Sequence, residues 1–368
     1  MRRRSWVEIN LETIANNYKI FDSIIGSNRE VMAVVKADAY GHGDIQVSKK
    51  LQEIGCKNFA VSNIDEGIGL RKAGINGMIL VLGYTPASAA KELIEHDITG
   101  TLISSEYAED LKDYCEKNKI DSKKLKMHFA IDTGMNRIGL DGDDANLCER
   151  KIRKYAEAFN VTGIFTHLCV ADTPSESEFT ASQISKFEVI ADRVKDLEMP
   201  FVHYMNSAAG LWTNDFSTHA RLGIVLHGLK PDPENILPEE IKPALAWKSV
   251  ISMVKDLHKG ETIGYGRRFK AEKEMRVATI PTGYADGYSR LLSMKGHVYI
   301  AGKRANILGG VCMDQFMVDV TDIPEAKFET EVDLIGENYG ADDMARDIGT
   351  IGYEVVCDIS KRVPRVYI

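Results

Sequence analysis

Short apolar runs and longer amphipathic stretches alternate along the first two thirds of the chain. The runs cover residues 31–37, 58–63, 77–83, 99–105, 125–132, 161–168, 201–207 and 220–228. Between them lie segments such as DIQVSKKLQEI and FTASQISKFEVIADRVKDL, in which apolar residues recur at the three- and four-residue spacing of a helix face. Strands that alternate with helices predict a parallel sheet, and eight such units in about 200 residues are what a (β/α)8 barrel needs.

A doubly wound open sheet is the alternative for the same alternation. Dinucleotide-binding proteins of that class carry a G-x-G-x-x-G turn after the first strand, and residues 35–43 here do not contain one. We therefore predict an α/β fold with a TIM-type barrel.

The pattern changes at residues 231–243, PDPENILPEEIKP, which contain several of the ten prolines of the chain. Beyond this segment come short β-like runs with glycine-rich turns: WKSVISMV, RVATIPTG, HVYIAG, ANILGGV and VDLIG. We expect a barrel domain over residues 1–234 and a mainly β domain over 235–368, with one short helix near 342–351.

Composition and charge narrow the class of function. The net charge of −8 argues against nucleic acid as a partner, so a small-molecule substrate is expected. The six cysteines have neither the spacing of a zinc site nor the density of a disulfide scaffold, which predicts reduced thiols, a cytoplasmic location and no metal. No apolar run reaches the about 18 residues of a membrane span, so we expect no membrane contact. We interpret Arg2 to Arg4 as a solvated N-terminus in preference to a juxtamembrane remnant.

The first apolar run ends in Lys36, at the edge of the barrel where active sites lie. A partly desolvated lysine titrates easily and can form a Schiff base. A lysine whose charged end reaches solvent at the barrel rim is the alternative. The next residues, ADAYGHG, combine polar, aromatic and glycine side chains as in a loop that covers a ligand, which favours the reactive lysine.

Other strand ends carry further candidates. The fifth run ends in the segment DTGMNRIG, which places Arg137 at the barrel mouth. The alternative is that Arg137 only forms an ion pair at the surface, as many arginines do. The sixth ends in His167, the seventh in Ser207, and the eighth contains RLGI at 221–224. Small and hydroxyl residues after strands seven and eight are where barrel enzymes commonly hold a phosphate. Alone, His167 or Ser207 would more often be structural.

Four motifs resemble those of the alanine racemases, and the resemblance covers nearly the whole chain. VVKADAYGHG is similar to the cofactor-lysine motif, DTGMNRIG to the substrate-arginine motif, and IGYG and GGVCMDQ to motifs of the second domain. The resemblance implies a pyridoxal-phosphate-dependent racemase that interconverts L- and D-alanine. It also implies a homodimer with shared active sites, in which Tyr265 and Met313 reach the site from the other subunit.

The resemblance further implies a role for each candidate. Lys36 would form the Schiff base with pyridoxal phosphate and act on the D-enantiomer, while Tyr265 would be the base for the L-enantiomer. Arg221 would face the pyridine nitrogen with His167 beside it, and Arg137 would hold the phenolic oxygen and help to bind the substrate carboxylate. The phosphate would be bound around Tyr40, Ser207, Gly223, Ile224 and Tyr353.

Two departures from the family pattern affect this interpretation. Ala130 stands where many members have a lysine, often carbamylated, that orients the substrate arginine. A chloride or a water is an alternative occupant of that space. His227 stands where a tyrosine is usual.

Two other functions are weighed against alanine racemisation. The chain also resembles the soluble domain of membrane-anchored serine racemases, but the bulky Tyr353 is expected to restrict the pocket to a methyl group. A non-catalytic pyridoxal-phosphate carrier with the same barrel would lack the second domain, which here includes Tyr265 and the 312–314 motif.

Overall fold

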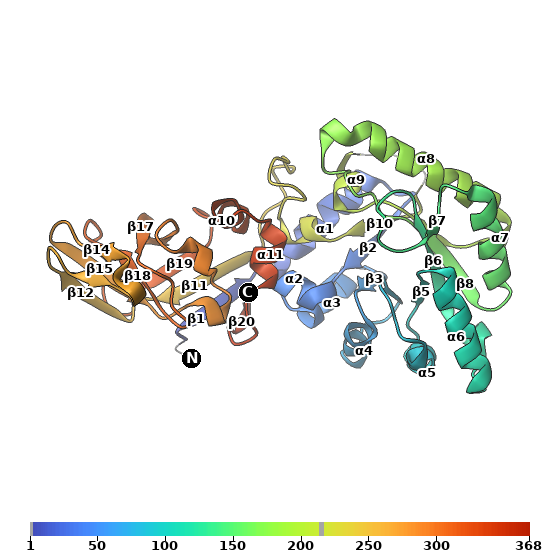
Figure 1. Ribbon diagram of the computed structural model, residues 1–368, viewed down its shortest axis with the longest axis horizontal. Helices are drawn as coiled ribbons and strands as arrows, with labels where there is room; N and C mark the ends of the chain where they lie inside the picture. The colour runs from blue at the N-terminus through green and yellow to red at the C-terminus, as the bar shows by residue number, and fades with distance from the viewer. Residues whose placement is uncertain (1–2, 213–216) are drawn as a thin grey trace. The chain divides into compact units, whose positions relative to one another are not determined.

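The computed structural model describes residues 3–212 and 217–368, so Arg2 of the N-terminal arginines lies outside the described residues. The chain divides into two compact units (Figure 1). We call Ala15–Ala39 with Gly43–Leu226 the barrel unit. The β unit consists of the segment up to Ile14, Tyr40–His42 and His227–Ile368. Among the described residues, no helix has the length and apolar character to cross a membrane.

Parallel strands form the core of the barrel unit. They are β2 (Glu30–Val34), β3 (Asn58–Val61), β4 (Met78–Val81), β5 (Gly100–Leu102), β6 (Lys126–Asp132), β8 (Asn160–Phe165), β9 (Phe201–His203) and β10 (His219–Leu222). They pair in the orders β10-β2-β3-β4 and β5-β6-β8-β9, and the short β7 (Leu140–Asp141) pairs with β6. The parallel bridges Leu80↔Thr99 and Met205↔Ala220 join the two groups into a closed ring. The predicted TIM-type barrel is therefore confirmed.

Helices follow the strands and lie outside them in Figure 1. Short polar side chains cap some of them: Ser104 accepts from the Tyr107 amide at 3.1 Å at the start of α6, and Asp144 accepts from the Leu147 amide at 2.9 Å at the start of α7. The helices are α1 (Leu11–Ile25), α2 (Lys36–Gly41), α3 (Asp44–Glu53), α4 (Ile64–Lys72), α5 (Ala90–Glu95), α6 (Ser105–Lys117), α7 (Ala145–Ala156), α8 (Ser177–Arg193) and α9 (Ser207–Trp212).

The β unit is built on a nine-stranded sheet of order β12-β15-β18-β17-β16-β19-β11-β1-β20. The predicted short helix corresponds to α10 (Ala341–Ile348), and α11 (Gly352–Cys357) follows it without having been predicted. The strands are β1 (Ser5–Ile9), β11 (Leu245–Val250), β12 (Met253–Leu257), β15 (Met275–Ile280), β16 (His297–Ile300), β17 (Lys303–Leu308), β18 (Phe316–Asp319), β19 (Glu331–Ile335) and β20 (Arg365–Tyr367), with a separate hairpin of β13 (Thr262–Ile263) and β14 (Phe269–Lys270).

The N-terminal strand β1 belongs to the sheet of the β unit. It runs antiparallel to β11, with Val7 opposite Trp247, and parallel to β20. Val7 and Ile9 are fully buried, as alternate residues of a strand with one face on a core should be. Residues from both ends of the chain therefore share one sheet in the β unit.

Candidate active site

Lys36 lies two residues beyond the end of β2 and is half-buried, after a run of buried apolar residues. Lys36 is the first residue of α2, and the residues after it form a left-handed turn: φ is 53° at Ala37, 57° at Asp38, 49° at Ala39 and 53° at Tyr40. Each non-glycine residue in this conformation costs about 1–2 kcal/mol. Strain of this kind persists only where the surroundings enforce it, and it is concentrated at functional sites.

Side chains of the barrel unit brace the beginning of this turn. Glu66 accepts the Ala37 amide at 2.8 Å with one carboxylate oxygen and the Ser62 amide at 2.7 Å with the other. Asp38 accepts the Asp44 amide at 3.2 Å. Glu66 thus links the residue after Lys36 to the neighbouring strand β3, because Ser62 directly follows that strand.

The end of the turn is held within the β unit. Arg365 donates from Nε to the Gly41 carbonyl at 3.0 Å. A side chain at Gly41 would lie 2.2 Å from the Val356 carbonyl oxygen, so this position requires a glycine for its close approach as well as for its φ of +79°.

We predict that Ala37→Gly leaves the protein at least as stable, or up to about 1 kcal/mol more stable, because glycine adopts positive φ without a steric cost. Ala37 is exposed, so little packing is lost. The matched control is Ala181→Gly at an exposed position inside α8, which should cost about 1 kcal/mol. Thermal unfolding of both variants measures the difference. Equal destabilisation by the two changes would show that the turn is not strained at Ala37.

Arg221 is the most deeply buried charged side chain at the barrel mouth, with an exposed fraction of 4%. Its Nη1 lies 2.8 Å from Nδ1 of His203 and donates to the His203 carbonyl at 3.1 Å. Its Nη2 donates to the carbonyls of Thr166 at 2.8 Å and Tyr204 at 3.1 Å, and lies 3.3 Å from Nδ1 of His167. Neutral acceptors therefore fix the guanidinium in one orientation.

Positive charges converge on His167. Burial, followed by the charges of Arg221, Arg137 and Lys36, lowers the pKa of His167 to about 3. Burial and the charge of Arg137 lower the pKa of Arg221 to about 9, which still leaves this guanidinium charged at neutral pH. The predicted residues Lys36, Arg137, His167 and Arg221 thus act on one another within the barrel unit, around an imidazole that stays neutral.

Ser207, Gly223 and Ile224 are buried together where strands β9 and β10 end. The Gly223 amide donates to the Ser207 hydroxyl at 2.8 Å, which leaves the hydroxyl proton able to point elsewhere. Asn206 accepts from the Ala209 amide at 2.9 Å and so fixes the start of α9. The Ser207 hydroxyl is thus a donor available to a phosphate oxygen at the start of α9.

The other two predicted phosphate ligands meet in the β unit. The rings of Tyr40 and Tyr353 lie edge to face with centroids 6.0 Å apart. His227 packs against Tyr40 at 5.3 Å and stacks on His42 at 4.1 Å. Burial, followed by the neighbouring His42, holds the pKa of His227 far below its usual value, so this imidazole is neutral.

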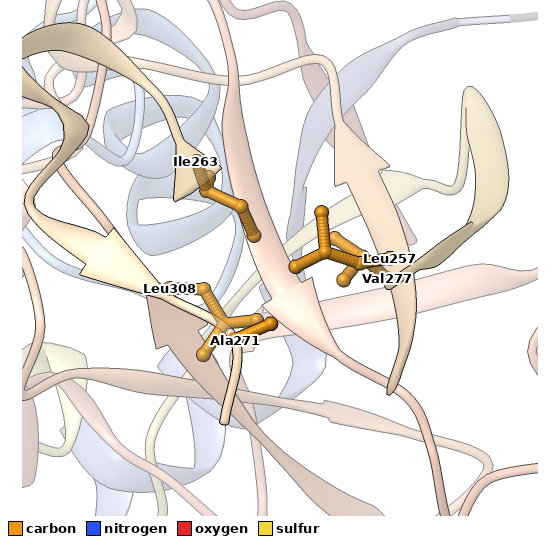
Figure 2. Close-up of a cluster of buried hydrophobic side chains, with 5 residues drawn as sticks. All are labelled: Leu257, Ile263, Ala271, Val277 and Leu308. Atoms are coloured by element: carbon orange, nitrogen blue, oxygen red, sulfur yellow. The ribbon is translucent and has the colours of Figure 1, made fainter. Parts of the chain in front are cut away.

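Tyr265 is presented on the hairpin between β13 and β14 with an exposed fraction of 81%. The glycines on either side have positive φ, +70° at Gly264 and +69° at Gly266, which turns the backbone sharply around the tyrosine. Figure 2 shows the apolar cluster under this hairpin, to which both arms of the hairpin contribute: Leu257, Ile263, Ala271, Val277 and Leu308. A rigid support thus carries an exposed aromatic side chain.

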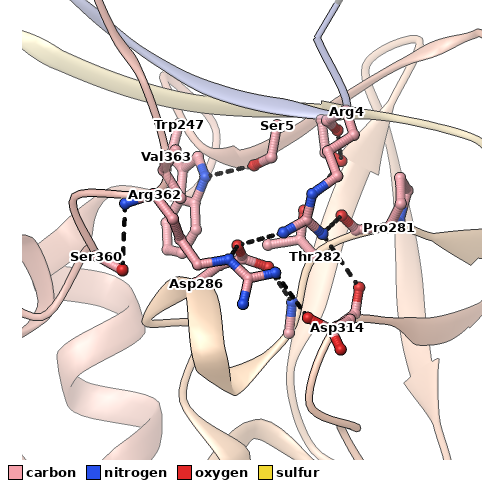
Figure 3. A network of polar contacts seen from close by, with 12 residues as sticks. Arg4, Ser5, Trp247, Pro281, Thr282, Asp286, Asp314, Ser360, Arg362 and Val363 are labelled. Atoms are coloured by element: carbon pink, nitrogen blue, oxygen red, sulfur yellow. Dashed lines mark hydrogen bonds and ion pairs between the residues drawn. The ribbon is translucent and has the colours of Figure 1, made fainter.

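Met313, with an exposed fraction of 53%, directly precedes Asp314. Asp314 belongs to the charged network that Figure 3 shows. Asp286 is almost fully buried and accepts from Arg4 at 2.7 Å, and Arg362 Nε lies 3.0 Å from it. Arg362 also donates to Asp314 at 2.7 Å. The backbone adds to this support, since the Ala285 amide donates to the Met313 carbonyl at 3.0 Å.

We predict that Asp286→Ala lowers the free energy of unfolding by about 2–3 kcal/mol, because it leaves the buried Gly283 amide without its acceptor and removes one carboxylate partner from each of two arginines. The control is Asp196→Ala, which removes an exposed ion pair with Arg153 and should cost less than about 1 kcal/mol. Thermal or urea unfolding measures both. Similar losses for the two variants would mean that the Asp286 network contributes no more than a surface pair.

Sequence reasoning missed the side chains that hold the predicted ones. His203 contacts Arg221, and Phe165 lies 5.6 Å beneath its guanidinium, yet both are on strands where they resemble ordinary core residues. Glu66 lies on α4, far along the chain from the turn that it braces. Ala130 is buried on β6, so this strand offers no charge to Arg137 from that position.

The fold and these residues define a class: proteins with a TIM-type barrel and a mainly β unit, in which a lysine closely follows the first barrel strand. The family model for the alanine racemase N-terminal domain matches residues 9–231, and that for the C-terminal domain matches residues 244–367. The chain belongs to the alanine racemase family.

Individual relatives agree with this assignment. An alanine racemase of Clostridium perfringens is 42% identical, over 99% of this chain and 95% of the relative. The solved alanine racemase of Clostridium difficile has a TM-score of 0.93 at 34% identity, covering 100% of this chain and 96% of the other. The alanine racemase of Bartonella henselae, solved with covalently bound pyridoxal phosphate, has a TM-score of 0.89 at 28% identity, covering 100% of both chains. The predicted family is confirmed, while the roles of individual residues stay predictions.

Proposed function

We propose that this protein interconverts L- and D-alanine with pyridoxal phosphate, using Lys36 and Tyr265 as its two bases. The observation that carries the proposal is Lys36 itself, just beyond the end of β2, before a strained turn and within electrostatic reach of His167. The relatives are named as alanine racemases, and the Bartonella henselae structure holds pyridoxal phosphate covalently.

The residues present fit this cofactor. Lys36 would attach it through its amine, while Ser207, Gly223, Ile224, Tyr40 and Tyr353 would hold its phosphate. Arg221 has only donors and would leave the pyridine nitrogen unprotonated, which favours a short-lived carbanion and return of the proton. When bound, pyridoxal phosphate supplies the electron withdrawal that stabilises the negative charge left at the α-carbon.

Two bases follow from the stereochemistry. Racemisation removes a proton from one face of a planar carbon and returns one to the other face, and a single fixed base cannot easily reach both. Lys36 serves one face and Tyr265 the other. Arg137 binds the substrate carboxylate, and Met313 lies against the substrate.

Racemisation assays with both enantiomers of alanine and of serine test the proposal. We expect alanine to be preferred, because the bulky Tyr353 restricts the pocket to a methyl group. A preference for serine would overturn the substrate assignment and support a serine racemase. Pyridoxal-phosphate binding without α-hydrogen exchange on any amino acid would overturn catalysis and leave a cofactor carrier.

We further propose a homodimer in which each subunit's Tyr265 and Met313 complete the partner's site, since both side chains are exposed on their own chain. Buried thiols such as those of Cys56, Cys115 and Cys148 suit a reducing compartment, and we propose the cytoplasm.

Mixing inactive Lys36→Ala protein with Tyr265→Phe protein should restore part of the activity. In a hybrid dimer one site receives both bases and the other receives neither, so complete exchange should give about a quarter of the wild-type rate for shared sites. Native mass spectrometry checks that subunits exchange. Exchange without recovered activity would place both bases in the same chain.

A further inference from the structure

Buried imidazoles line the interior of the barrel unit below Arg221. His128 on β6 and His203 on β9 are fully buried, and His219 on β10 is nearly so. Nε2 of His203 lies 3.3 Å from Nδ1 of His128. Arg221, His203 and His128 thus form a continuous chain of hydrogen-bonding groups that leads away from the barrel mouth.

Arg221 sets which atom donates and which accepts in each of these hydrogen bonds. A guanidinium has donors only, so Nδ1 of His203, at 2.8 Å from Arg221, must accept. The single proton of a neutral His203 then lies on Nε2 and points to Nδ1 of His128, which must accept in turn. His128 therefore carries its proton on Nε2.

Both imidazoles are neutral, as this assignment requires. Burial, followed by the charge of Arg221, holds the pKa of His203 far below its usual value. Burial, followed by His219, lowers the pKa of His128 to about 3. At neutral pH each ring thus has one donor and one acceptor, and a wrong tautomer at His203 would set a donor against the Arg221 donor.

The single hydrogen bond of the His128 ring is the one that its Nδ1 makes with His203 among the described residues. Its other nitrogen, Nε2, is buried and has no hydrogen-bond partner among the described residues, so the imidazole leaves one polar atom unsatisfied. Gly163 on β8 provides the space, because a side chain there would lie 2.8 Å from Cε1 of His128. An apolar residue would fill such a position without leaving a buried polar atom unsatisfied, which commonly costs about 1–3 kcal/mol.

We propose that His128 is a positioning residue: it accepts the Nε2 proton of His203 and, together with the Arg221 donor on the other side of the ring, fixes the His203 tautomer whose Nδ1 holds Arg221 in place. The charge of Arg221 polarises this chain, which strengthens the bond between the two imidazoles. The consequence for catalysis rests on the proposed function, since Arg221 would face the pyridine nitrogen there. The His203 tautomer depends only on the contacts with Arg221 and His128, so it should be the same with and without cofactor.

The test uses ¹⁵N-labelled histidine, whose ring nitrogens report by NMR which of them carries the proton. In the wild-type protein, apo and loaded, we expect Nε2–H at both His203 and His128. His128→Phe leaves the buried Nε2 proton of His203 without an acceptor, which weakens the preference that Arg221 alone must then maintain, so His203 should partly populate the Nδ1–H tautomer. His128→Asn can place its amide oxygen where Nδ1 of His128 lies, as an acceptor for the Nε2 proton of His203. This variant should therefore retain Nε2–H at His203.

Kinetics provide the second readout. His128→Phe should lower kcat for alanine about 10-fold, with little change in KM. This is the lower end of the loss of activity seen when residues that support a directly binding side chain are changed at metal sites. His128→Asn should recover most of this loss. His219→Phe is the matched control, because it removes another buried imidazole of the barrel. Nδ1 of His219 lies 2.8 Å from the Thr218 hydroxyl. Among the described residues, the His219 ring has no hydrogen bond to Arg221 or His203.

Each outcome bears on the proposal. Nδ1–H at His203 in the wild-type protein would overturn it without any variant, as would an unchanged His203 tautomer in His128→Phe. Equal losses of kcat in His128→Phe and His219→Phe would indicate a packing effect and would overturn the positioning role. Failure of the proposed function would appear separately, as a wild-type enzyme that does not racemise alanine while its tautomers are as expected.

Discussion

Lys36→Ala is expected to lower alanine racemisation by at least about 10⁴-fold and to abolish covalent attachment of pyridoxal phosphate. Alanine has no amine to condense with the aldehyde, and the same change removes one of the two bases. Borohydride reduction followed by peptide mass spectrometry measures the attachment, which in the wild-type protein should map to Lys36. Recovery of cofactor on a different lysine would refute the central assignment.

Lys36→Arg separates the two roles of this position. It keeps a positive charge near His167 but supplies no nucleophilic amine, so it should be as inactive as the alanine variant. Lys49→Ala, at an exposed position on α3, is the control and should retain activity. Appreciable activity in Lys36→Arg would mean that charge at this position matters more than covalent attachment.

Barrel strands were predictable because most of their residues are buried, so each strand appears in the sequence as a short run rich in apolar residues. β1 was not predicted, since its pairing of Val7 with Trp247 joins residues from opposite ends of the chain and leaves no local pattern. α11 was not predicted for a different reason, because its six residues are too few for a helical periodicity to stand out.

Lys36 was identified because a charge that ends an apolar run is unusual. The left-handed turn after it was not predictable, because alanine and tyrosine rarely adopt positive φ unless tertiary contacts such as those of Glu66 and Arg365 enforce it. His203 was missed for a related reason. Its role appears only when Arg221 is brought beside it from another strand.

Tyr265→Phe is expected to break the symmetry between the two enantiomers. The phenolic oxygen is the proposed base for L-alanine, so its loss should stop removal of the α-hydrogen from L-alanine. Lys36 should still exchange the α-hydrogen of D-alanine, even though net racemisation falls by about 10³-fold or more. Incubation in deuterium oxide with each enantiomer, followed by proton NMR of the α-position, measures both exchange rates.

Tyr299→Phe, on β16 of the same unit, is the matched control and should exchange both enantiomers at the wild-type rate. The argument depends on which pattern appears. A single base that serves both faces would lose exchange from both enantiomers together when it was removed, and a tyrosine without a chemical role would change neither. Only two bases on opposite faces predict loss for L-alanine with retention for D-alanine. Equal exchange of both enantiomers in Tyr265→Phe would exclude Tyr265 as a base, and the exposure of its side chain would then need another explanation, such as a contact with the partner subunit alone.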